Sequence, residues 1–180
     1  MNKNYIETNR LILRRFEETD IDDFFECCQN PNLGNNAGWK PHESKEESLA
    51  ILKSFFIESE NNVWAVVLKE TDRIIGSIGL VPDPKREHPH SGMLGYWLKE
   101  SCWGKGYMSE ATQAVLKFGF STLNLNLVTA NCYPHNERSQ QVLKRNGFVY
   151  EGLLHQAEVT YDEKVLDHLC YYLTKEEYIK

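Results

Sequence analysis

The 180-residue chain is 41% hydrophobic and 26% charged, which is typical of a folded domain with a sizeable core and excludes a disordered chain. Its formal net charge of −6 argues against broad contact with nucleic acid or an anionic membrane, because both need clustered positive charge. The N-terminus lacks the apolar segment of a secretory signal, and the longest apolar run, 63–68, is too short to span a bilayer. We therefore expect a soluble, cytoplasmic protein with one domain over residues 1–180 and reduced cysteines, since its five cysteines form no C-x-x-C pair.

The first third of the chain predicts a strand followed by two helices. Residues 10–16, "RLILRRF", alternate apolar and polar side chains like a half-buried strand. Thr19 or Asp20 is expected to cap the first helix, and Ser44 with Glu47 forms a capping box for the second. The predicted apolar face of this second helix consists of Leu49, Leu52, Phe55 and Phe56.

The middle of the chain predicts strands of one sheet. Residues 63–68 and 74–80 are rich in β-branched residues and are separated by a polar turn, which indicates an antiparallel hairpin. The proline-rich stretch 81–90 cannot lie inside a strand, and "GMLGYWL" (92–98) then continues the sheet.

The last third predicts two helices among further strands. A helical face of Ala111, Ala114, Val115 and Phe118 precedes a strand at 126–132. Asn136 or Pro134 is expected to begin a helix that ends at Gly147, and 148–154 and 166–174 are expected to pair antiparallel. Hairpins combined with strand–helix–strand crossovers predict an α+β fold, in which a mixed sheet carries helices on its faces.

The stretch "ESCWGKGYMSEA" (100–111) is the most informative loop. Gly104 and Gly106 place bare backbone amides and a helix N-terminus at one point, which suits a pyrophosphate, and Lys105 adds a positive charge. A nucleotide-hydrolysing P-loop is disfavoured because Gly106 follows the lysine, and a dinucleotide fingerprint would need glycine in place of Ser109. A plain turn that uses glycine for positive φ remains an open alternative.

Three stretches carry a resemblance to a known family: "GYWLKESCWGKGYMSEA", "ANCYPHNERSQQVLKRNGF" and "YEG". They resemble the acetyl-CoA-binding half of the GNAT N-acetyltransferases, and the chain is most similar to the branch with the ribosomal-protein serine/alanine N-terminal acetyltransferases. The opening "TNRLILRRF" and the closing "LDHLCYYLT" extend the resemblance over nearly the whole chain. It implies the GNAT fold, with a mostly antiparallel sheet flanked by helices on both faces, and acetyl-CoA as co-substrate.

The resemblance also implies a set of site residues. Backbone groups of Trp97 and Leu98 would align the pantetheine arm in the splay between the strands at 93–98 and 127–132, and the amides of 103–108 would hold the pyrophosphate. The implied cofactor-binding residues are Trp97, Leu98, Trp103, Gly104, Lys105, Gly106, Tyr107, Met108, Asn136 and Ser139. One departure is Ser101, which replaces the usual Gln or Arg of the family's [QR]-x-x-G-x-[GA] loop and leaves binding more dependent on backbone amides and Lys105.

Two side chains are the implied catalytic residues. Ser139, in the family's N-x-x-S pattern, would donate a hydrogen bond or proton to the leaving thiolate, and Glu158 would act as general base, directly or through water. The competing interpretations are that Asn136 is simply an N-cap, that Ser139 is an ordinary first-turn residue, and that Glu158 is a solvent-facing strand carboxylate. No metal is expected, because the histidine spacings match no ligand pattern. Cys102 and Cys132, near the slot, are expected to be structural thiols.

The acceptor is expected to be a primary amine. An α-amino group has a pKa of about 7.7–8.0 against about 10.4 for lysine, so a protein N-terminus such as that of a ribosomal protein presents more free base. The alternatives are a small-molecule acceptor (polyamine, amino acid or antibiotic) and a non-catalytic acyl-CoA-binding module. The acceptor pocket is expected to be lined by residues 32–41, Trp64, the 84–90 loop and Tyr161. A homodimer formed through an exposed sheet edge is left open.

Overall fold

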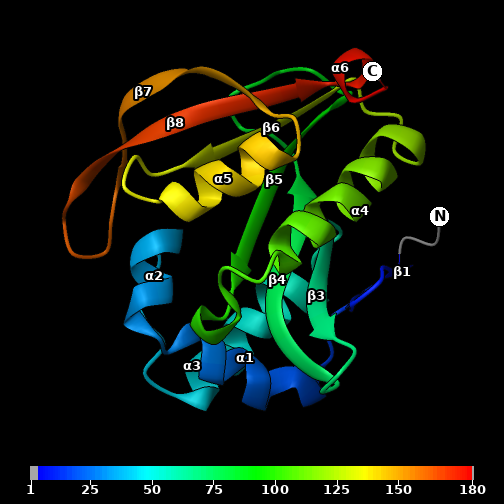
Figure 1. The fold of residues 1–180 in the computed structure, drawn as a ribbon. Coiled ribbons are helices and arrows are strands. Elements are labelled where there is room, and N and C mark those ends of the chain that lie inside the picture. The colour runs from blue at the N-terminus through cyan, green and yellow to red at the C-terminus, as the bar shows by residue number, and fades with distance from the viewer. Residues whose placement is uncertain (1–3, 180) are drawn as a thin grey trace.

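The computed structural model describes residues 4–179, whose strands form one mixed sheet (Figure 1). The strands are β1 (Tyr5–Glu7), β2 (Leu11–Arg14), β3 (Asn62–Leu68), β4 (Arg73–Val81), β5 (Ser91–Leu98), β6 (Leu127–Cys132), β7 (Val149–Val159) and β8 (Val165–Thr174). Their order across the sheet is β1-β2-β3-β4-β5-β6-β8-β7, and every neighbouring pair is antiparallel except β5–β6. The helices are α1 (Ile21–Cys28), α2 (Pro31–Ala37), α3 (Lys45–Ile51), α4 (Tyr107–Ser121), α5 (Glu137–Arg145) and α6 (Lys175–Ile179).

Helices cover both faces of the sheet because its central strands are apolar on both sides. Along β3, Trp64 and Val66 point into a core shared with α4 and α5, and the alternate residues Ala65 and Val67 point into a second core under α1, α2 and α3. The two helix groups are visible as separate layers in Figure 1. No helix within residues 4–179 is long and apolar enough to cross a bilayer.

The predicted strands and the longer helices are present, and the differences lie in short elements. Sequence patterns did not predict β1, α2 or α6. The second predicted helix ends at Ile51 and continues as a wider π-helical turn, η2 (Leu52–Ile57). This turn shifts the side-chain period, so Phe55 is 69% exposed and its prediction as a core residue is wrong.

Helix capping follows the prediction at Ser44 and departs from it at Asp20. The Ser44 hydroxyl accepts the backbone N–H of Glu47 at 3.1 Å. Asp20 precedes α1, but its carboxylate caps no amide of that helix. Instead it receives two hydrogen bonds from the guanidinium of Arg14, at 2.7 and 2.8 Å, and fixes β2 to the chain that follows.

The divergence of β5 and β6 positions the site. The two strands pair in parallel only from Ser91–Leu127 to Leu94–Ala130, and β5 then continues to Leu98 with no strand partner on this side among residues 4–179. The unpaired edge of β5 leads directly into a short helical turn, η3 (Glu100–Cys102), and the glycine loop. The fold therefore opens a slot between the sheet, α4 and α5.

Candidate active site

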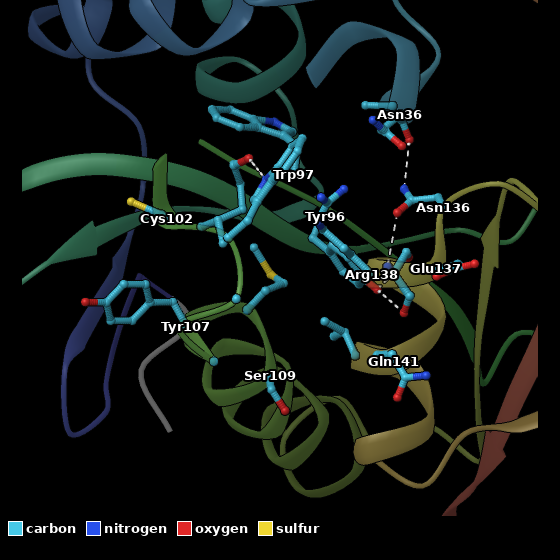
Figure 2. A pocket seen from close by; sticks show the side chains of 18 of the residues that line it. Asn36, Tyr96, Trp97, Cys102, Tyr107, Ser109, Asn136, Glu137, Arg138 and Gln141 are labelled. Atoms are coloured by element: carbon cyan, nitrogen blue, oxygen red, sulfur yellow. Dashed lines mark hydrogen bonds between the residues drawn. The ribbon is translucent and has the colours of Figure 1, made fainter. Parts of the chain in front are cut away.

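A cavity of about 360 Å³ occupies this slot. Its walls come from the end of α2, the end of β5, the glycine loop, the first turn of α4 and one side of α5 (Figure 2). The predicted cofactor-binding residues that line it are Trp97, Leu98, Trp103, Gly104, Gly106, Tyr107, Met108, Asn136 and Ser139. Lys105 is exposed beside the cavity and does not line it, and Glu158 lies outside it.

The glycine loop leaves a row of amides without internal partners. Gly104 and Gly106 have φ of +75° and +79°, which side-chain-bearing residues rarely adopt, so turn geometry alone accounts for both glycines. Gly106 is the N-cap of α4 and supplies no capping side chain. The amide of Trp103 donates to Glu100 O, but those of residues 104–108 find no acceptor among residues 4–179. These free donors at a helix N-terminus suit an anion.

Successive residues at the end of β5 point their backbone N–H and C=O groups in opposite directions. Lys99 N–H donates to Ile75 O at 2.7 Å beside the Gly76–Leu98 pair, so the N–H and C=O of Leu98 point away from β4, toward the slot. By the same alternation, the backbone groups of Trp97 face β4, and only its side chain reaches the cavity. The Leu98 carbonyl already accepts the indole N–H of Trp103 at 2.7 Å.

Ser139 and Asn136 form the first turn of α5 at the inner end of the cavity. Asn136 is the N-cap, because its Oδ1 accepts Ser139 N–H at 3.1 Å, and its Nδ2 donates to Asn36 O of α2 at 3.3 Å. Figure 2 shows this chain of contacts from α2 to α5. The Ser139 hydroxyl lies 2.8 Å from the Tyr96 hydroxyl, and burial raises the pKa of Tyr96 above its ordinary value. Tyr96 therefore remains a neutral hydroxyl partner of Ser139.

Glu158 lies on β7 next to the C-terminus of α2. Its Oε2 accepts the hydroxyl hydrogen of Tyr133 at 2.9 Å and lies 3.1 Å from His168 Nε2. Burial, and then the carboxylate of Glu158, raise the pKa of Tyr133, so this hydroxyl keeps its proton and donates. A Cβ on Gly38 would lie 2.4 Å from the Tyr133 hydroxyl and 2.8 Å from Glu158 Oε1, so Glu158 packs directly against bare backbone.

Three basic side chains at or beside the cavity have no carboxylate partner within residues 4–179. More than half of the described lysines and arginines form ion pairs with a carboxylate, as Arg10 does with Glu110. Arg138 and Arg145 line the cavity and have no carboxylate partner within residues 4–179, and the same holds for Lys105. Arg138 instead lies 4.6 Å from the ring centroid of Trp103. In a chain with a net charge of −6, this arrangement favours a polyanionic ligand at the cavity.

The expected acceptor-pocket residues are brought together only in part. The Tyr161 hydroxyl reaches Asn35 of α2 at 3.4 Å, so the β7–β8 hairpin and α2 meet near Glu158. Trp64 is fully buried against Phe118, 5.2 Å between ring centroids, so its predicted place in the acceptor pocket is wrong. Its strand position points it into the core under α4, which the local sequence did not reveal.

Of the two cysteines expected near the slot, Cys102 lines the cavity, and both are buried. Burial raises the pKa of the Cys132 thiol to about 11, which keeps it protonated at neutral pH. A protonated thiol is a poor nucleophile, in line with the expected structural role.

Several residues of this region had no signal in the sequence. Gly38, Tyr133 and His168 come from three separate elements and meet only at Glu158. The spacing of Arg138 and Arg145, seven residues apart on one helix face, is a signal that could have been read.

The sequence matches known proteins along most of its length. A family model described as "Acetyltransferase (GNAT) domain" matches residues 10–149. A relative from Bacillus licheniformis, "Uncharacterized N-acetyltransferase p20", is 30% identical over 174 residues, covering 95% of this chain and 96% of the relative. The "Ribosomal-protein-serine acetyltransferase" of Escherichia coli (strain K12) is 37% identical over 140 residues, covering 75% of this chain and 76% of that protein.

A solved structure confirms the fold. It is the "spermidine N-acetyltransferase from Vibrio cholerae in complex with CoA and spermine", which superposes with a TM-score of 0.79 at 21% identity. The superposition covers 96% of this chain and 100% of that chain. The predicted α+β fold, with a mixed sheet and helices on both faces, is therefore confirmed.

Proposed function

The chain belongs to the GNAT acetyltransferase family and is an N-acetyltransferase, and from this premise we propose that its acceptor is the α-amino group of a protein N-terminus, such as that of a ribosomal protein. GNAT enzymes use acetyl-CoA as the acetyl donor. The observation that carries the proposal is Glu158, a carboxylate held by hydrogen bonds beside the end of α2, whose last residues, Asn36 and Ala37, line the cavity of about 360 Å³. The similarity to a ribosomal-protein-serine acetyltransferase supports the same acceptor class.

The residues around the cavity fit acetyl-CoA. The unpartnered amides of 104–108 at the N-terminus of α4 match a pyrophosphate, and the free edge of β5 at Leu98 matches an amide-containing arm. The arm must compete with the Trp103 indole for the Leu98 carbonyl, while the Leu98 N–H remains available.

Arg145 is the proposed partner of the 3′-phosphate on the ribose of the cofactor. Its neighbour Asn146 donates from Nδ2 to the Ser109 hydroxyl at 3.0 Å, which holds the end of α5 against the first turn of α4. A ribose attached to a pyrophosphate at that turn would therefore lie close to Arg145. An arginine is suited to this contact because its guanidinium forms charge-assisted hydrogen bonds with phosphate.

Ser139 and Glu158 are the proposed catalytic residues. Acetyl-CoA supplies an acetyl group already activated as a thioester. Ser139 would hydrogen-bond the sulfur as negative charge develops on it, and its contact with Tyr96 orients the hydroxyl. Glu158 would accept, directly or through one water, the proton that the amine loses as its nitrogen bonds to the acetyl carbon.

The acceptor preference follows from proton chemistry. At pH 7 an α-amine with a pKa near 7.7–8.0 is roughly one-tenth free base, whereas a lysine side chain with a pKa near 10.4 is far less so. A single carboxylate base can therefore deprotonate an N-terminal amine at a smaller free-energy cost than a lysine side chain. A polyamine is the second candidate, because the net charge of −6 attracts a polycation.

An acceptor panel tests the proposal. Purified protein with acetyl-CoA is incubated with peptides that carry free N-termini, the same peptides with blocked N-termini and an internal lysine, and spermidine. Free thiol is followed continuously, and products are identified by mass spectrometry. Acetylation of the free N-terminus alone supports the proposal, turnover of spermidine alone supports the second candidate, and no thiol release with any amine favours a non-catalytic module.

A further inference from the structure

An irregularity in the β7–β8 hairpin determines where Glu158 lies. Leu154 pairs with His168 and Glu158 pairs with Leu166, so four steps along β7 match two steps along β8. The strand β7 thus contains two extra residues at this point. In an uninterrupted ladder, residue 156 would face Leu166, and the bulge places Glu158 there, on the face that carries His168.

Asp167 holds the bulge from the opposite strand. Its carboxylate accepts the backbone N–H of Gln156 at 2.8 Å and contacts the ring of His155 at 3.2 Å. Gln156 has a φ of +49°, an unusual value for a residue with a side chain. Bulges and residues in rare backbone conformations are over-represented beside active sites, where a bulge can re-aim a side chain.

The two oxygens of Glu158 are not equivalent. Oε2 receives the Tyr133 hydroxyl and faces His168 Nε2, which must carry the hydrogen because a carboxylate oxygen only accepts. His168 Nδ1 is buried with no partner in the described chain, so the ring is held through its Nε2 contact with Glu158. Oε1 receives no hydrogen bond from any described residue and faces Gly38.

We propose that Tyr133, His168 and the Asp167-held bulge are positioning elements that leave Oε1 of Glu158 as the one oxygen open to the acceptor amine, which approaches over the bare backbone of Gly38. The inference rests on the proposed role of Glu158 as base. The groups that face this carboxylate are Tyr133 from the connection after β6, with His135 stacked on its ring at 5.3 Å, His168 from β8, and Gly38 after α2. The amine proton moves to Oε1, while Oε2 stays anchored.

The donors on Oε2 should affect turnover more than acceptor binding. They orient the carboxylate that accepts the amine proton, and their hydrogen bonds go to Glu158 Oε2. A loss in kcat with little change in KM, recovered by a conservative variant, therefore separates a positioning role from a merely structural one.

The test uses the acceptor with the fastest turnover in the panel. Tyr133→Phe and His168→Leu are each expected to lower kcat at least tenfold, while KM for the acceptor stays within about twofold of the parent value. His168→Gln, whose amide nitrogen can replace Nε2, should recover most of the rate. Tyr172→Phe, on the same strand, is the matched control and should behave like the parent enzyme.

The outcomes separate this inference from the proposed function. If Glu158→Gln is inactive while Tyr133→Phe and His168→Leu keep the parental kcat, the positioning role is wrong and the base assignment is retained. If Glu158→Gln keeps the parental kcat, both the positioning role and the base assignment are wrong. Should the Tyr133 and His168 variants unfold, a second pair of variants tests the bulge. Asp167→Leu must lower kcat more than Asp167→Asn, because the amide oxygen of asparagine still accepts the Gln156 N–H. Equal kcat values for these two variants would overturn the inference.

Discussion

Adding one methyl group at Gly38 should lower kcat at least tenfold at a small cost in stability. Gly38 has a φ of +85°, and its Cβ would lie 2.4 Å from the Tyr133 hydroxyl and 2.8 Å from Glu158 Oε1. The matched control is Gly147→Ala, because Gly147 has a φ of +82° and its Cβ would meet only Leu173 Cδ1, at 3.8 Å. The two variants share the backbone strain and differ in the clash.

The magnitudes follow from these contacts. A side chain in the left-handed region costs about 1–2 kcal/mol, partly offset by about 0.4–1 kcal/mol from a less flexible unfolded chain, so Gly147→Ala should lose about 1 kcal/mol. Gly38→Ala should lose about 1 kcal/mol more, because the Tyr133–Glu158 hydrogen bond cannot persist with a methyl at 2.4 Å. For a chain of this size, Tm should fall by about 2–4 °C in the control and about twice that in Gly38→Ala.

Thermal unfolding and thiol release at saturating acetyl-CoA provide the two measurements. Gly38→Ala is expected to lose at least tenfold in kcat, because the methyl displaces Glu158 and covers the approach to Oε1. Gly147→Ala should keep the parental kcat. A Gly38→Ala enzyme that folds and turns over like the parent would refute both the location of the base and the direction from which the amine arrives.

Three further predictions concern other parts of the chain. Ser139→Ala should lower kcat about 10²-fold with acetyl-CoA affinity within threefold of the parent; unchanged turnover in stopped assays would remove its proposed role. Arg145→Met should weaken CoA about tenfold in calorimetry and leave dephospho-CoA unaffected, whereas equal losses for both ligands would contradict the 3′-phosphate contact. Burial holds the pKa of Cys27 at about 12 and that of Cys132 at about 11, so the unfolded chain releases these protons first as pH rises above about 9. The free energy of unfolding in urea should therefore fall between pH 7.5 and 10 by about 1 kcal/mol per thiol, and Cys27→Ala should show a smaller fall; an equal fall would count against this cause.

The sequence by itself determined the elements whose signals are local. The β3–β4 hairpin, the glycine loop that leads into α4, and the α5 N-cap at Asn136 followed from β-branched runs, positive-φ glycines and a capping side chain. Each of these elements depends on neighbours a few residues away, so the local sequence pattern is enough to predict it. The candidate cofactor residues were implied by the resemblance to the GNAT family, whose motifs lie mostly on that single loop and the first turn of α5.

Only the tertiary structure decided what depends on distant partners. The burial of Trp64 and the exposure of Phe55 depend on which face of the sheet a strand presents and on a π-helical turn, and neither follows from local apolar spacing. The surroundings of Glu158 depend on a bulge held by Asp167 across the hairpin and on Gly38, more than a hundred residues away in the chain. Folding creates such a site through long-range packing, because no single segment contains its parts.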